Sequence, residues 1–194
     1  MQRKMKLILL ALCLVGTAAH SQTQFKIGVN KDNNIKLSGT SSLHDWEMNS
    51  KTFSGNAQFL LKAGNNSITL KNLEFVLPVK QLKSEKKALT KNALKALKSE
   101  KYKNISYKLK SAKSLEDKGS KYRISTVGNL TISGETREVV IQMDCIINNQ
   151  GRITCSGQYN IKMSDFKVDP PKFMGGMMTT GDDIVLDFTM VFER

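Results

Sequence analysis

The amino-acid sequence predicts an all-β fold, an antiparallel sheet of about eight strands with one short helical interruption. Three observations support this prediction. Apolar and polar residues alternate through several runs of the chain, as they do in strands with one buried face. Glycine, asparagine and serine cluster between these runs, and most of the connections are short. Such strands close into an up-and-down barrel or stack as a sandwich.

The first 21 residues have the three-part composition of a secretory signal peptide. Three basic residues precede the apolar run 7–16, and small residues follow it up to Ser21. The apolar run is too short to span a bilayer comfortably. We therefore expect residues 1–21 to be removed on export, although cleavage after Ala19 also fits the pattern. Residues 22–194 then form one domain, located in the periplasm or secreted.

Eight runs carry the strand signal. The last of them, 184–192, alternates most strictly, with Leu186 and Phe188 on one face and Asp187 on the other. Pro78 lies at the end of the third run, which suits a strand terminus. The eight runs are 34–41, 52–62, 67–79, 105–109, 122–132, 139–147, 153–161 and 184–192.

The helical interruption is predicted over residues 85–99. Leu89, Ala93, Ala96 and Leu97 fall on one face of this helix, and lysines occupy the rest. Such a basic amphipathic helix can contact an anionic membrane surface. The apolar strip is narrow and has no aromatic anchor, which favours a short helix packed across the mouth of the barrel.

The chain is strongly basic, with a formal net charge of +13 that falls to +10 without residues 1–21. Lysine supplies nearly all of this charge, since only four arginines lie in residues 22–194. Recognition of bases and phosphates relies on arginine, so we expect no nucleic-acid partner. A solvated lysine surface explains the composition better.

Two cysteines, Cys145 and Cys155, flank the turn-forming sequence 148–151. In a hairpin centred near Gln150 the two sulfurs lie opposite each other on the same face of the sheet. Export places them in an oxidising compartment, so we predict a disulfide. Two buried free thiols are the alternative.

The residues of enzymatic chemistry are scarce. His44 is the only histidine in residues 22–194, which excludes a histidine-rich metal site and leaves one candidate base for a catalytic triad. Asp45 is its neighbour, but adjacent side chains of an extended segment point to opposite faces. A hydrogen-bonded turn residue is the commoner role for such a histidine. We predict no catalytic residue, no metal and no enzyme activity. The long segment 164–183, rich in methionine and glycine, is predicted to be a loop that acts as a lid or mouth.

Several motifs resemble those of the YceI-like family of exported bacterial proteins. They are LSGTSSLHDW at 37–46, the helix-to-strand junction 96–107, GNLTISGETR at 128–137, SDF at 164–166 and GDDIVL at 181–186. The similarity covers nearly all of residues 22–194, with the motifs in the family's order. The resemblance implies a lipocalin-like antiparallel barrel of the bacterial periplasm. It also implies an apolar tunnel that holds a polyisoprenoid chain, such as an isoprenoid quinone or a related lipid.

A barrel of about eight strands has an interior that side chains can just fill or that holds one slender ligand. We therefore expect a non-enzymatic protein that sequesters or carries an isoprenoid-type lipid, with no other cofactor. Trp46 has an apolar body and one N–H donor, which suits either a rim contact with a polar head group or an ordinary core position. The candidate ligand-binding residues are Phe59, Phe75, Tyr107, Leu109, Tyr159, Ile161 and Phe188 inside the barrel, with His44, Trp46 and Phe166 near its mouth.

A second hypothesis keeps the barrel but fills it with side chains. The protein is then an interaction module of the cell envelope, whose lysine-rich helix contacts anionic lipid or a protein partner. A homodimer formed through an exposed face is compatible with either hypothesis.

Overall fold

The structure, a computed structural model, describes residues 23–62, 67–118, 121–173 and 178–194; the predicted signal peptide lies outside them. The described residues form eleven strands, one α-helix and two short 3-10 turns. In chain order these are β1 (Thr23–Ile27), β2 (Asn34–Ser41), β3 (Trp46–Ser50), β4 (Ser54–Lys62), β5 (Ser67–Pro78), η1 (Val79–Gln81), α1 (Lys87–Ala96), β6 (Asn104–Lys118), β7 (Lys121–Ile132), β8 (Glu135–Ile147), β9 (Ile153–Lys162), η2 (Ser164–Phe166), β10 (Lys172–Phe173) and β11 (Met178–Glu193).

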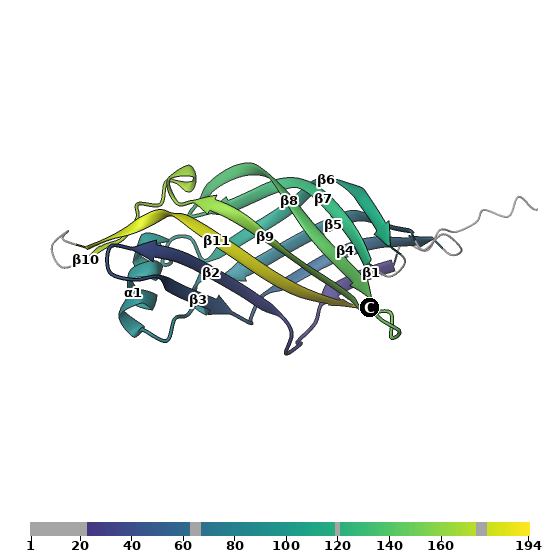
Figure 1. The fold of residues 1–194 in the computed structure, drawn as a ribbon, viewed down its shortest axis with the longest axis horizontal. Coiled ribbons are helices and arrows are strands. Elements are labelled where there is room, and N and C mark those ends of the chain that lie inside the picture. Colours follow the sequence, from purple (N-terminus) through teal and green to yellow (C-terminus); the bar gives the residue numbers. More distant parts are fainter. Residues whose placement is uncertain (1–22, 63–66, 119–120, 174–177) are drawn as a thin grey trace, which may run out of the picture.

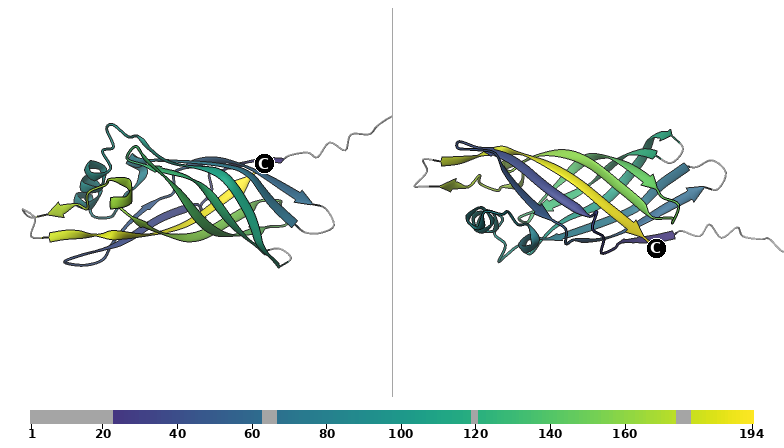
Figure 2. Two further views of the ribbon diagram at one scale, coloured as in Figure 1. Left: turned by 90° about the horizontal axis from the view of Figure 1, so that it is seen from above. Right: turned by 60° about the horizontal axis from the view of Figure 1, so that its bottom comes forward.

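Eight of the strands close into an antiparallel barrel (Figures 1 and 2). Their order around the wall is β1-β4-β5-β6-β7-β8-β9-β11, and β11 returns to pair with β1. The hairpin β2–β3 adds two strands beside β11. The predicted all-β class, the antiparallel barrel and the single short helix are therefore confirmed.

The long strand β11 has two partners along its length on the same side. Near its end, Phe192 lies opposite Ile27 of β1. Farther up, from Thr180 to Thr189, its partner is β2. The hairpin β2–β3 thus extends the wall toward the end of the barrel where α1 lies, which we call the mouth (Figure 1). The C-terminus lies at the other end, the closed end.

The closed end is filled by aromatic side chains. The ring of Phe59 makes edge contacts with Phe25 and Phe192, with ring centroids 5.4 and 5.5 Å apart. All three side chains are almost completely buried. Edge-to-face aromatic packing stabilises a core beyond the burial of apolar area alone. The three rings therefore pack against one another inside the closed end.

The predicted disulfide is confirmed. Cys145 of β8 lies directly opposite Cys155 of β9, with Cα atoms 4.1 Å apart and a bond between the sulfurs. The turn between the two strands is stabilised by the Asn148 side chain, whose Oδ1 accepts hydrogen bonds from the backbone N–H groups of Gln150 and Arg152 at 3.0 and 2.9 Å.

Several predicted boundaries are wrong. Strands β1 and β3 were not predicted, because each has only five residues, too few for their alternation of buried and exposed side chains to stand out in the sequence. Helix α1 is shorter than the predicted 85–99, and β6 continues well beyond residue 109. The predicted loop 164–183 contains η2, β10 and the start of β11. The polar residues at the start of β11 belong to the strand because they pair with β10 and β2. Such tertiary contacts cannot be predicted from the alternation of apolar and polar residues. Residues 174–177 of that loop lie outside the described ranges.

Candidate ligand-binding site

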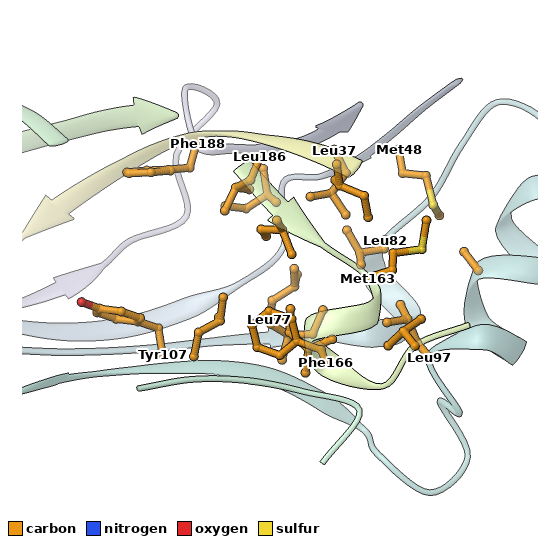
Figure 3. A pocket seen from close by; sticks show the side chains of 18 of the residues that line it. Leu37, Met48, Leu77, Leu82, Leu97, Tyr107, Met163, Phe166, Leu186 and Phe188 are labelled. Carbon is orange, nitrogen blue, oxygen red and sulfur yellow. The ribbon is translucent and has the colours of Figure 1, made fainter. Parts of the chain in front are cut away.

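An apolar cavity occupies the barrel between the aromatic cluster and the mouth (Figure 3). Tyr107 and Phe188 lie toward one end of it, and Met48 and Leu97 toward the helix. Among the described residues, no charged side chain lines it. The lining residues are Ile35, Leu37, Trp46, Met48, Leu73, Phe75, Leu77, Leu82, Leu89, Ala93, Ala96, Leu97, Ile105, Tyr107, Thr126, Leu130, Ile132, Ile141, Met143, Ile161, Met163, Phe166, Val168, Pro171, Thr180, Ile184, Leu186, Phe188 and Met190.

The cavity is large enough for a small or slender ligand. The space that the centre of a water molecule can occupy in it measures about 170 Å³. One water needs about 10–15 Å³ by this measure, so the cavity has room for on the order of ten waters, or about 300 Å³ of liquid. Ligand pockets in proteins begin at about this size. The barrel interior is therefore hollow, and the side chains that face it do not fill it.

The most deeply placed polar groups of the cavity wall are already hydrogen-bonded to each other. The Tyr107 hydroxyl donates to Thr126 Oγ1 at 3.0 Å, and Thr126 Oγ1 donates to the backbone oxygen of Ile141 at 2.9 Å. Each hydroxyl has a single hydrogen, and this chain uses both. Burial raises the pKa of Tyr107 above its usual value, so the group stays a neutral phenol. Neither hydroxyl has a hydrogen left for a ligand.

Tyr107 reaches Thr126 across a glycine. Its ring lies over Gly128 of β7, and a Cβ atom built at Gly128 would lie 2.4 Å from the ring. No real Cβ makes such a contact, so only glycine at this position admits the ring. Gly128 belongs to the GNLTISGETR sequence, so this motif determines where the Tyr107 ring lies in the cavity wall.

The polar groups nearer the mouth are satisfied as well. Trp46 Nε1 donates to the backbone oxygen of Thr40 at 2.9 Å, and Thr180 Oγ1 donates to that of Pro171 at 3.0 Å. The indole of Trp46 packs on Gly39, its partner in the β2–β3 hairpin. The N–H of Trp46 is therefore engaged by the protein, and its indole lines the cavity from the β2–β3 hairpin.

The segment after β9 forms one wall of the cavity through η2. Asp182 accepts hydrogen bonds from the backbone N–H and the hydroxyl of Ser164, at 2.8 and 2.6 Å, and these bonds hold its pKa below the usual value. On the other side, Arg137 Nε donates to the backbone oxygen of Asp165 at 2.8 Å. Held in this way, η2 directs the buried side chain of Phe166 into the barrel.

Helix α1 covers the cavity at the mouth. Leu89, Ala93, Ala96 and Leu97 line it, as the apolar face predicted for this helix requires. The helix is anchored at its C-terminal end, where the Ser133 hydroxyl donates to the backbone oxygen of Leu97 at 2.9 Å. None of its residues is fully buried. It is thus a cover that rests on the cavity rather than a helix embedded in the core.

Six of the ten sequence-predicted ligand residues line the cavity: Trp46, Phe75, Tyr107, Ile161, Phe166 and Phe188. The other four do not. Phe59 belongs to the aromatic cluster of the closed end, because β4 meets β1 there. Leu109 and Tyr159 are partly buried against the core but are not among the lining residues.

His44 lies in the exposed turn between β2 and β3, outside the cavity. The backbone N–H and C=O of His44 are both bonded to the Ser41 hydroxyl, at 3.3 and 2.7 Å. Its ring nitrogen Nε2 lies 2.7 Å from Lys86 Nζ, at the N-terminal end of α1. It is a hydrogen-bonded turn residue that joins the hairpin to the helix.

Sequence reasoning missed the lining residues of the irregular segments. Met48 comes from the unpredicted strand β3, Leu82 follows η1, and Met163 and Val168 flank η2. Alternation did not identify them, because β3 is too short for its pattern to stand out and the segments around η1 and η2 are not extended strands. The motif SDF was the available signal for η2.

Two kinds of feature are absent from the described part of the chain. It contains no cluster of three or more His, Cys, Asp or Glu side chains that could hold a metal ion. It also contains no helix with the length and apolar character needed to cross a bilayer.

The fold and the cavity define a class of protein, an antiparallel β-barrel with a hollow, apolar interior. The YceI-like domain family matches residues 16–192, and the chain belongs to this family. The family resemblance predicted from the motifs is therefore confirmed. A search of curated protein sequences gave no significant match.

Solved structures share the fold. The polyisoprenoid binding domain from Saccharophagus degradans, described as implicated in plant cell wall breakdown, is 10% identical with a TM-score of 0.66, over 89% of this chain and 99% of that one. Burkholderia cenocepacia BcnA is 19% identical with a TM-score of 0.60, over 81% and 95%. The Campylobacter jejuni YceI protein is 21% identical with a TM-score of 0.56, over 76% and 84%.

Proposed function

We propose that the protein is an exported, non-enzymatic binding protein that sequesters or carries an isoprenoid-type lipid, such as a polyprenyl chain or quinone, in the barrel interior. The observation that carries the proposal is a hollow interior whose polar groups bond to the protein itself. Each 100 Å² of apolar ligand surface removed from water contributes about 2.5 kcal/mol, so a prenyl chain needs no polar recognition to bind.

The same wall disfavours polar ligands. A ligand acceptor atom deep in the cavity would lose its hydrogen bonds to water and find no free hydrogen on Tyr107, Thr126 or Trp46, so the carbonyl oxygens of a quinone are expected at the mouth, in contact with water. Burying such a group without a partner costs about 1–3 kcal/mol. Four methionines in the lining, Met48, Met143, Met163 and Met190, supply flexible, polarisable contacts that adapt to a slender chain.

Two comparisons support this choice of ligand class. The chain belongs to the YceI-like family, and it shares its fold with a domain described as polyisoprenoid binding. The filled-barrel hypothesis has less support, because the interior is hollow. Export agrees with the disulfide, which forms in oxidising compartments, and with the signal-peptide pattern of residues 1–21.

Organic extraction of the purified protein followed by mass spectrometry tests the proposal, together with a titration of delipidated protein with a short-chain quinone. Leu186→Trp places a large side chain in the cavity and is expected to lower the affinity at least tenfold. Val185→Trp is the matched control, since it puts the same side chain on the outer face of β11. An empty extract combined with no quinone binding by the wild-type protein would sink the proposal.

A further inference from the structure

The outer surface of helix α1 carries a regular row of lysines. Lys87, Lys91 and Lys95 follow one another at four-residue spacing on α1, Lys98 lies two residues after the end of the helix, and together with Leu94 these lysines border one shallow groove. We call these four residues the lysine face. They lie opposite the apolar residues of the same helix that line the cavity. One short helix thus presents a cationic side to solvent and an apolar side to the ligand space.

The charge of the lysine face is not compensated. In the described part of the chain, none of its four lysines lies within ion-pair distance of an acidic side chain, whereas several lysines of the barrel wall are paired. Lys108 lies 3.2 Å from Glu74, and Lys162 lies 3.1 Å from Asp183. Glu100 is the one acid at the groove, and it is bound by two other lysines, Lys80 and Lys103.

Such a row does not benefit the fold. Like charges three and four residues apart destabilise a helix, because the side chains are neighbours on its surface. Asn92 and Leu94, which lie between Lys91 and Lys95 in the sequence, carry no negative charge that could offset this repulsion. A cationic row with a cost in stability and no internal partner is suited to an external anion.

The lysine face lies at the end of the barrel where a flat partner surface can approach it. Helix α1 stands at the mouth, beside the β2–β3 turn, to which it is joined by the contact of Lys86 with His44 (Figure 1). That turn exposes Leu43, whose side chain is 60% accessible. Peripheral proteins bind membranes through two components, basic side chains and exposed apolar side chains, and both are present here.

We propose that the lysine face docks the mouth of the barrel on the anionic phospholipid headgroups of a bilayer. Lysine ammonium groups are point charges that make no directional, two-pronged bonds, so a row of them fits a diffuse layer of phosphates better than the shaped surface of an acidic protein. Each lysine near an anionic surface multiplies the membrane affinity about fivefold at moderate salt. The attraction decays within about 10 Å at 0.1 M salt.

Docking in this orientation has a consequence for ligand loading, which rests on the proposed function. The helix that contacts the lipid surface is also the cover of the apolar cavity. A lipid tail that leaves the bilayer under α1 reaches the cavity with little exposure to water. The docking surface itself does not depend on which ligand the cavity holds.

Vesicle co-sedimentation tests the docking surface without any cavity ligand. Wild-type protein is expected to bind vesicles of phosphatidylcholine with one third phosphatidylglycerol, and to stay in solution with phosphatidylcholine alone. Lys87→Gln/Lys91→Gln/Lys95→Gln keeps residues that favour a helix and is expected to lower the partition coefficient roughly 100-fold, from three factors of about five.

The matched control removes the same net charge elsewhere. Lys31, Lys71 and Lys113 are exposed, have no salt bridge in the described part of the chain and lie outside α1. The triple variant Lys31→Gln/Lys71→Gln/Lys113→Gln is expected to keep its partition coefficient within a few-fold of wild type. Equal losses in the two triple variants would show that net charge alone drives binding, and would overturn the proposal. So would absence of wild-type binding to the anionic vesicles.

The single tryptophan reports the orientation. Trp46 begins strand β3 next to the turn at the mouth, so lipid with a nitroxide on its headgroup is expected to quench its fluorescence in the docked protein. Unquenched Trp46 in vesicle-bound protein would overturn the proposed orientation. If docking fails while quinone binds with normal affinity, only the docking surface is refuted; if docking succeeds and no quinone binds, the proposed ligand is refuted instead.

Discussion

The hydrogen-bonded chain from Tyr107 through Thr126 to Ile141 allows a sharp test of the cavity wall. Tyr107→Phe removes the first donor and leaves Thr126 bonded to the Ile141 oxygen. The loss is that of one ordinary hydrogen bond, about 0.5–1.5 kcal/mol. Thr126→Val is expected to cost more, about 1–3 kcal/mol, because the Tyr107 hydroxyl then lies in an apolar wall without an acceptor.

The double variant distinguishes this reasoning from simple loss of packing. With Phe at position 107 no donor is left unsatisfied, so Thr126→Val adds little to the cost of Tyr107→Phe. We expect the double variant to be destabilised by about 1 kcal/mol, well below the sum of the two single changes. Urea unfolding of the wild type, the two single variants and the double variant measures the coupling energy between positions 107 and 126. The comparison requires that the free energy of unfolding fall with urea concentration at the same slope in all four proteins. Additive effects would refute the view that the two hydroxyls satisfy each other.

The same variants probe the proposed ligand. Because Tyr107 has no free hydrogen to offer, Tyr107→Phe is expected to change the affinity for a short-chain quinone by less than about threefold. A loss of tenfold or more, equal to about 1.4 kcal/mol, would mean that the hydroxyl contacts the ligand directly. The cavity would then recognise a polar group, contrary to the proposed function.

Three further predictions concern stability. Replacing both disulfide cysteines by alanine is expected to cost about 2.5–3 kcal/mol, from the sequence separation of 10 residues and the loop-entropy relation, and urea unfolding measures it. Gly128→Ala forces the Tyr107 ring out of its place and is expected to cost about 1–3 kcal/mol and to lower the melting temperature, whereas a wild-type melting temperature would contradict the close contact. The hydrogen bond from Arg123 lowers the pKa of Asp144 from 3.8 to about 2, so its stabilisation is complete above the unfolded-state pKa and is lost as the pH falls from about 4 toward 2. Since the pair is near solvent, Asp144→Asn should remove about 1 kcal/mol at pH 6 and only a small fraction of that at pH 2, where about half of the native carboxyl groups are still ionised, and an equal loss at both pH values would contradict the ion pair.

Which side chains of a strand face the interior of the barrel could be predicted from local patterns. Ile184, Leu186 and Phe188 alternate with polar residues, and all three line the cavity. The cysteines flanking residues 148–151 form the expected bridge, because a hairpin turn and a register of directly opposed residues are both short-range features. The apolar face of the helix was also evident from its spacing.

The position of a residue along the barrel could not be predicted in this way. Phe59 and Phe75 both point inward from neighbouring strands, yet only Phe75 lines the cavity. Their difference depends on the packing of Phe59 against Phe25 and Phe192, which are distant in sequence. A period-two pattern specifies a face of the sheet and gives no information on the height of a residue within the barrel.

The sequence by itself determined the all-β class, the family motifs, the apolar strip of the helix and the cross-strand disulfide, because each depends on spacing along one chain segment. Tertiary structure alone decided that the interior is hollow, that the hydroxyls of Tyr107 and Thr126 satisfy each other, and that the lysine face has no acidic partner among the described residues. These properties depend on which side chains meet across the closed barrel. That outcome is set by strand register and side-chain packing over the whole molecule.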